Sequence, residues 1–124
     1  MPVTRLFEHS SDAQPVAAGT TIFRKGDPRD RMYAVVFGEV DILVDGKLVE
    51  TVGNGGIFGE MALIDNESRT ATAVARTDVN LVAVDEKRFL FLIQQTPNFA
   101  IHVMRVLSDR LRRMDERLSR ATRG

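Results

Sequence analysis

The chain has 124 residues, 17 basic and 17 acidic side chains, and no cysteine. This length favours a single domain, and the balanced charge gives no general attraction to nucleic acid or to an anionic membrane. The lack of cysteine excludes disulfides, thiolate metal sites and cysteine nucleophiles, and no apolar run approaches the roughly 20 residues that span a bilayer, so we expect a cytoplasmic protein without a membrane segment.

Short strands are predicted over residues 15–84, because glycine or Asx residues interrupt this stretch at regular intervals. Such spacing is typical of an all-β sandwich or barrel. The clearest hairpin covers residues 40–52, where Asp45-Gly46 lies between two apolar runs and suits a tight turn with positive φ angles. Residues 73–84 predict two more strands, with a turn at Thr77-Asp78.

Two helices are predicted after the strands. Asp85 is a suitable N-cap for a helix over residues 86–95. Its apolar face is formed by Phe89, Leu92 and Ile93. Thr96-Pro97 ends this helix, and a longer one follows from about residue 98 to about residue 119. The fold class is therefore mainly β with C-terminal helices.

We expect one domain over residues 1–124. Within it, a β-roll or barrel covers residues 15–84, and a short and a long α-helix cover residues 85–120. This order places any binding residues of the strands before the helical part of the chain.

The middle of the chain has residues suited to an anion. Gly59 and a helical turn predicted to start at Glu60 would place free backbone N–H groups at a helix N-terminus, which attracts an anion. Arg69 follows, and its guanidinium matches two phosphate oxygens. An ionised Glu60 only accepts hydrogen bonds, so it suits a sugar hydroxyl. Ala71 and Ala73 are small enough to let backbone approach a ligand.

Residues 58–75 resemble the phosphate-binding cassette of the cyclic-nucleotide-binding domain family. That family includes the catabolite activator protein, regulatory subunits of cyclic-nucleotide-dependent kinases, and cyclic-nucleotide-gated channels. Its pattern is Phe-Gly-Glu, an apolar residue, a small residue and Leu, then a turn and Arg, Ser/Thr/Ala, Ala, which residues 58–63 and 69–71 match. The upstream segments that also match are 18–27, 32–40 and 52–60. The resemblance covers about residues 15–118 and implies a double-stranded β-helix, a jelly-roll-like β-roll.

The resemblance also implies the binding residues. These are Phe58, Gly59, Glu60, Met61, Ala62, Arg69, Thr70 and Ala71. By this resemblance, Arg69 pairs with the cyclic phosphate and Glu60 accepts from the ribose 2′-hydroxyl. Backbone N–H groups around Gly59, Ala62 and Ala71 hold phosphate and sugar, and Thr70 lies beside the base. One departure is Ser68, where many members have proline, which loosens the loop but leaves the role of Arg69 intact.

The last predicted helix carries an apolar seam with the a/d spacing of a coiled coil. The seam residues are Met104, Leu107, Leu111, Met114 and Leu118. The seam packs either on its own roll or on a second copy, and the resemblance to catabolite-activator-like proteins favours a homodimer through this helix. Arg112 and Arg113 are candidates to contact the base. The seven arginines of residues 98–124 indicate a solvated helix face more than a nucleic-acid surface, and we expect no DNA-reading element in this chain.

The leading hypothesis is a non-catalytic sensor of cyclic AMP or cyclic GMP that repositions its C-terminal helices about a hinge in residues 84–96. No cofactor or metal is expected beyond this ligand. A cupin-like metalloenzyme needs a His and carboxylate cluster, but no His lies between Ser10 and Ile101, and a phosphodiesterase would need a two-metal ligand set that the sequence lacks. A nucleotide-free dimerisation or interaction domain of the same superfamily stays open as the alternative.

Overall fold

The computed structural model describes residues 7, 12–28, 30–60, 69 and 71–123, with only the backbone described at 114 and 117–123. The chain divides into two compact units, Met1–Leu90 and Phe91–Gly124. The single domain expected over residues 1–124 stays a prediction.

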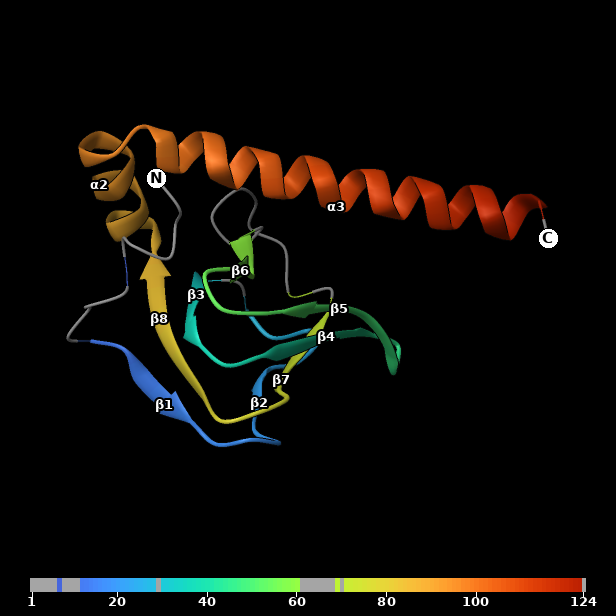
Figure 1. The fold of residues 1–124 in the computed structure, drawn as a ribbon, viewed down its shortest axis with the longest axis horizontal. Coiled ribbons are helices and arrows are strands. Elements are labelled where there is room, and N and C mark those ends of the chain that lie inside the picture. Colours follow the sequence, from blue (N-terminus) through green and yellow to red (C-terminus); the bar gives the residue numbers. More distant parts are fainter. Residues whose placement is uncertain (1–6, 8–11, 29, 61–68, 70, 124) are drawn as a thin grey trace. The chain divides into compact units, whose positions relative to one another are not determined.

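The first unit contains two antiparallel four-stranded sheets (Figure 1). One sheet has the order β1-β8-β3-β6 and the other β2-β7-β4-β5, so strands distant in sequence are neighbours in both. The strands are β1 Gln14–Val16, β2 Thr21–Phe23, β3 Arg31–Phe37, β4 Val40–Val44, β5 Lys47–Val52, β6 Ile57–Phe58, β7 Thr72–Ala75 and β8 Val79–Asp85. With the two C-terminal helices, this arrangement confirms the predicted mainly β fold class.

The predicted hairpin is present as β4 and β5. Asp45 and Gly46 adopt φ angles of 51° and 80°, which is the backbone of a tight two-residue turn. The register shifts between Ile42 and Leu43, so the hairpin contains a bulge that sequence alternation did not predict. The predicted turn at Thr77-Asp78 is also present, because β7 ends at Ala75 and β8 starts at Val79.

The hydrophobic core of this unit lies between the two sheets. It combines residues of β3, β6 and β8 from one sheet with residues of β2, β4, β5 and β7 from the other. Its buried members are Phe23, Val35, Val40, Val52, Phe58, Ala73, Ala75, Val79 and Leu81. Burial of this set drives the two sheets together, because apolar area removed from water is the main favourable term in folding.

Helix α2 spans Glu86–Gln95, as predicted. The Asp85 carboxylate accepts a hydrogen bond from the backbone N–H of Arg88 at 2.8 Å, which confirms Asp85 as the N-cap. The residues predicted to share an apolar face are each half-buried, namely Phe89, Leu92 and Ile93. Leu90 and Phe91, which point elsewhere, are more than half exposed.

Helix α3 spans Asn98–Arg123. It reaches beyond the predicted end near residue 119, because the next four residues contain no glycine or proline and can continue a helix. In α3, Phe99 and Val103 are buried, whereas the seam residues Met104 and Leu111 are mostly exposed. No described helix has the length and apolar character needed to cross a membrane.

Candidate binding site around Arg69

The backbone of Arg69 is held by the turn between β2 and β3. The Arg69 N–H donates to the carbonyl oxygen of Asp27 at 2.8 Å, and the Arg69 carbonyl accepts from the N–H of Gly26 at 2.8 Å. The turn itself is closed by the Asp27 N–H, which donates to the Arg24 carbonyl at 3.0 Å, and by the Asp27 carboxylate, which accepts from the Arg24 N–H at 2.9 Å. These hydrogen bonds fix the backbone position from which the Arg69 side chain extends.

The guanidinium of Arg69 lies inside the roll. The residue is only 5% exposed. Its Nη2 donates to the carbonyl of Arg31 at 2.6 Å and its Nη1 donates to the carbonyl of Gly59 at 3.2 Å. Its Cζ lies 3.9 Å from the ring centroid of Phe23, which is a cation–π contact. A buried charge is costly without such contacts, so these partners stabilise the guanidinium in the interior of the roll.

Gly59 makes room for the guanidinium. Its φ angle is 73°, in the region that favours glycine. A Cβ at this position would lie 2.7 Å from Nη1 of Arg69 and 3.4 Å from Cε2 of Phe23, so only glycine fits without displacement. The preceding Phe58 is 1% exposed, and its ring stacks on Tyr33 with centroids 5.2 Å apart. The aromatic side chains thus fix the backbone that approaches Arg69.

Glu60 directly follows Gly59 and is 4% exposed. The structure therefore brings Gly59 and Arg69 into contact and buries Phe58 and Glu60 beside Gly59 in the chain. Ala71 is half-buried. Met61, Ala62, Thr70 and the helical turn predicted after Glu60 lie outside the described residues.

Ala73, expected to let backbone approach a ligand, belongs to the hydrophobic core. It is fully buried on β7 and pairs with Ile42 of β4. Alternation along the strand turns it toward the space between the sheets, so its small size serves packing. Ala73 therefore belongs to the core and not to a ligand-facing surface, and the binding roles of the other residues in 58–71 stay predictions.

The family model described as the cyclic nucleotide-binding domain matches residues 13–96. This range contains both sheets and the whole region around Arg69. The chain belongs to the cyclic nucleotide-binding domain family.

Proteins of different overall organisation share this cyclic nucleotide-binding domain. A "CRP-like cAMP-activated global transcriptional regulator" of Mycobacterium tuberculosis is 34% identical over 113 residues, which are 86% of this chain and 50% of the relative. The solved catabolite activator protein of Thermus thermophilus superposes with a TM-score of 0.81 at 30% identity, over 97% of this chain and 59% of that one. An EAL enzyme in its cGMP-bound form superposes with a TM-score of 0.63 at 35% identity, over 85% of this chain and 29% of that one.

This chain spans at most half the length of the curated relatives compared with it. The family match therefore concerns the domain, and the activity of a whole relative does not transfer with it. The predicted family membership is confirmed, and so are the β-roll that the resemblance implied and the two C-terminal helices that the residue pattern predicted.

The candidate base contacts lie on α3, in the second compact unit. Arg112 and Arg113 are both exposed, and Nη1 of Arg112 lies 3.6 Å from the Asp109 carboxylate one turn earlier. Their contact with a base stays a prediction. His102 lies on the same helix, where burial and then the charge of Arg105 lower its pKa. Among the described residues, no three His, Cys, Asp or Glu side chains are grouped so as to hold a metal ion.

Sequence reasoning missed three groups that hold Arg69. They are the ring of Phe23, the carbonyl of Arg31 and the Gly26-Asp27 backbone. The Gly26-Asp27 pair was visible as a turn signal. The sequence did not show that this pair bonds to the backbone of Arg69, more than 40 positions later, because backbone donors and acceptors carry no residue-type signal.

Proposed function

We propose that this chain is a regulatory module that binds a cyclic purine nucleotide and performs no chemistry on it. The observation that carries the proposal is the buried guanidinium of Arg69, fixed by carbonyl oxygens and an aromatic ring beside a glycine that leaves space for it. An oriented guanidinium is the group that proteins use to bind phosphate oxygens in pairs.

The residues beside Arg69 suit the sugar and phosphate of such a ligand. Glu60, when ionised, offers acceptor oxygens only, which match the ribose 2′-hydroxyl and repel a phosphate. The positive φ of Gly59 turns the chain at this point and brings its backbone against the guanidinium. We assign the phosphate to Arg69 and the ribose to Glu60, with backbone N–H groups of residues 59–62 and 71 as further donors.

The base is proposed to be a purine, with cyclic AMP as the physiological ligand and cyclic GMP also bound. One relative is named for activation by cAMP and a solved relative is described in a cGMP-bound form, so the fold is compatible with both. Thr70 follows the phosphate-binding arginine and is proposed to face the base, with modest discrimination between the two nucleotides.

The signal is proposed to be a change in the packing of the C-terminal helices. A ligand shifts such an equilibrium only by binding one arrangement more tightly than the other. We further propose that α3 forms a homodimer, because the seam residues Met104 and Leu111 are 59% and 63% exposed. A helix face with large exposed apolar residues at a/d spacing is suited to a second helix of the same kind.

Isothermal titration calorimetry on the purified chain tests the binding proposal. We expect one cyclic nucleotide per chain, and we expect Arg69→Ala to weaken binding by at least about a hundredfold, because a phosphate would lose its buried cation. Arg76→Ala is the matched control, because it removes an exposed arginine that lies 3.9 Å from Asp41 of β4. Unchanged affinity in Arg69→Ala would refute the assignment of the site.

A further inference from the structure

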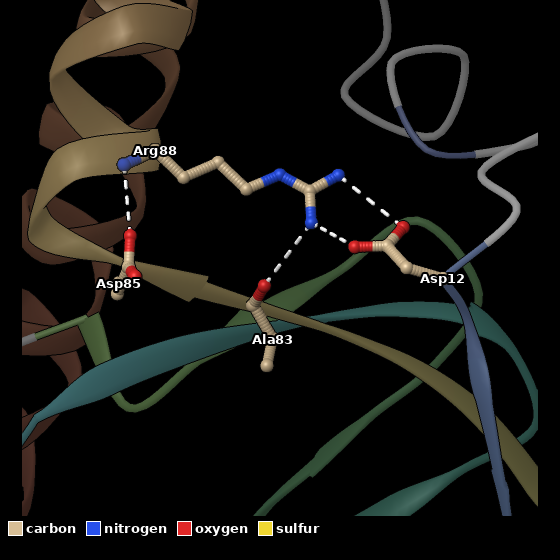
Figure 2. Close-up of polar contacts among 4 residues, drawn as sticks. All are labelled: Asp12, Ala83, Asp85 and Arg88. Carbon is tan, nitrogen blue, oxygen red and sulfur yellow. Dashed lines mark hydrogen bonds and ion pairs between the residues drawn. The ribbon is translucent and has the colours of Figure 1, made fainter.

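One arginine side chain links three segments of the first compact unit (Figure 2). Arg88, in the first turn of α2, donates from Nη1 to Oδ2 of Asp12, from Nη2 to Oδ1 of Asp12 at 3.5 Å, and from Nη1 to the carbonyl of Ala83 at 3.3 Å. Its Cζ also lies 5.9 Å from the ring centroid of Phe7, which is 2% exposed. We name this group of Arg88, Asp12, Ala83 and Phe7 the Arg88 clasp.

The clasp acts where strand β8 becomes helix α2. Strand β8 ends at Asp85 and α2 begins at Glu86, so no loop separates them. Asp85 pairs with Arg31 of β3 and also caps the helix through the N–H of Arg88. The first turn of α2 is therefore tied to the sheet by its backbone and to the segment before β1 by the Arg88 side chain.

The first compact unit closes at Leu90, two residues after Arg88, and the second begins at Phe91, although the helix continues to Gln95. Arg88 is the last residue of the clasp along the chain, so the whole clasp lies within the first compact unit. Its contacts join the first turn of α2 to β8 and to the segment before β1.

We infer that Arg88 is a positioning residue that joins the N-terminal segment and the first turn of α2 to the β-roll as one body, so that helix movement begins beyond Leu90. This rests on the proposed function and narrows the predicted hinge from residues 84–96 to residues 91–96. The Arg88 and Asp12 side chains are 32% and 55% exposed, so salt screens their attraction and weakens the clasp.

Residue-resolved amide hydrogen exchange on the 124-residue chain, with and without cyclic AMP, tests the inference. In the wild type, we expect the nucleotide to change protection at residues 91–96 by about tenfold or more and at residues 86–90 by less than about twofold. In Arg88→Met, the nucleotide-dependent change should spread to residues 86–90. Lys87→Met is the matched control, because Lys87 is an exposed neighbour on the same helix and loses the same charge.

Equal nucleotide-dependent changes at residues 86–90 and 91–96 of the wild type would overturn the inference. If Arg88→Met does not fold, Asp12→Asn removes the ion pair from the other side and should give the same spread. If calorimetry shows no nucleotide binding, the proposed function fails, but the clasp is still tested in the free protein. There, Arg88→Met must lower protection at residues 86–90 relative to Lys87→Met, and equal protection in the two variants would also overturn the inference.

Discussion

The region around Arg69 and the exposed face of α3 reverse the usual distribution of charge and apolar surface. In the roll, a guanidinium is 5% exposed, whereas on α3 the large apolar residues Met104 and Leu111 are 59% and 63% exposed. Buried charges and large exposed apolar side chains are the placements that folding alone does not favour. We propose an anionic ligand as the reason for the first placement and a second copy of the chain as the reason for the second.

The two regions also differ in how they are specified. Arg69 is positioned by backbone groups from Gly26, Asp27, Arg31 and Gly59, which come from separate parts of the chain. The α3 face is specified by spacing within one helix. Consequently, the geometry of the site depends on the assembled roll, whereas the seam depends on sequence spacing within one helix.

The largest effect is expected for the α3 face. We predict that Leu111→Glu raises the dimer dissociation constant by at least about a hundredfold, or about 2.7 kcal/mol, because two carboxylates would face each other in an apolar seam. Size-exclusion chromatography with light scattering measures this. Leu48→Glu is the control, since Leu48 is an exposed leucine, at 51%, on β5 of the roll.

A wild type that is monomeric at high micromolar concentration, with and without nucleotide, would contradict the proposed α3 seam. Dissociation of the dimer by Leu48→Glu as strongly as by Leu111→Glu would contradict it equally. Cyclic nucleotide affinity per chain, measured on the same samples, should change little in Leu48→Glu.

A smaller effect is expected at Gly59. We predict that Gly59→Ala weakens cyclic nucleotide binding by about ten- to a hundredfold, because the new methyl group would lie 2.7 Å from Nη1 of Arg69 and displace the guanidinium. Gly46→Ala is the control, since Gly46 has a similar φ of 80° with nothing within 4 Å of a Cβ.

Both glycine variants should lose about 1 kcal/mol of unfolding free energy from the unfavourable φ angle, as measured by urea denaturation. Only Gly59→Ala should also lose affinity. Equal affinities in the two variants would show that the contact with Arg69 does not position the ligand-binding group.

Local chemistry made much of the fold predictable. Asp45-Gly46 marked the turn between β4 and β5, and Asp85 marked the start of α2, because both act through neighbouring backbone. The short β6, the bulge beside Ile42 and the sheet order depend on pairing between distant segments. No residue type indicates such pairing. The sequence therefore predicted a β-roll or barrel but not the order of its strands.

The candidate site was likewise predictable only where it depends on residue types and not on contacts between distant segments. Gly59, Glu60 and Arg69 were visible as residue types in a recognisable order. The ring of Phe23 under the guanidinium and the Arg31 carbonyl that accepts from it became visible only with the roll assembled. The Arg88 clasp was likewise hidden, because Asp12 and Arg88 are 76 positions apart.

The smallest effect is expected at Thr70, the position after the buried arginine. Guanine carries a 2-amino donor that adenine lacks, and the Thr70 hydroxyl is an acceptor for it if the base adopts the syn conformation. One such hydrogen bond is worth about 0.5–1.5 kcal/mol, so Thr70→Ala should weaken cyclic GMP binding by about tenfold at most and leave cyclic AMP binding nearly unchanged. Paired calorimetric titrations of wild type and variant measure both affinities. Equal losses for the two nucleotides would place Thr70 at the phosphate, next to Arg69, and would remove the hydroxyl as a source of base discrimination.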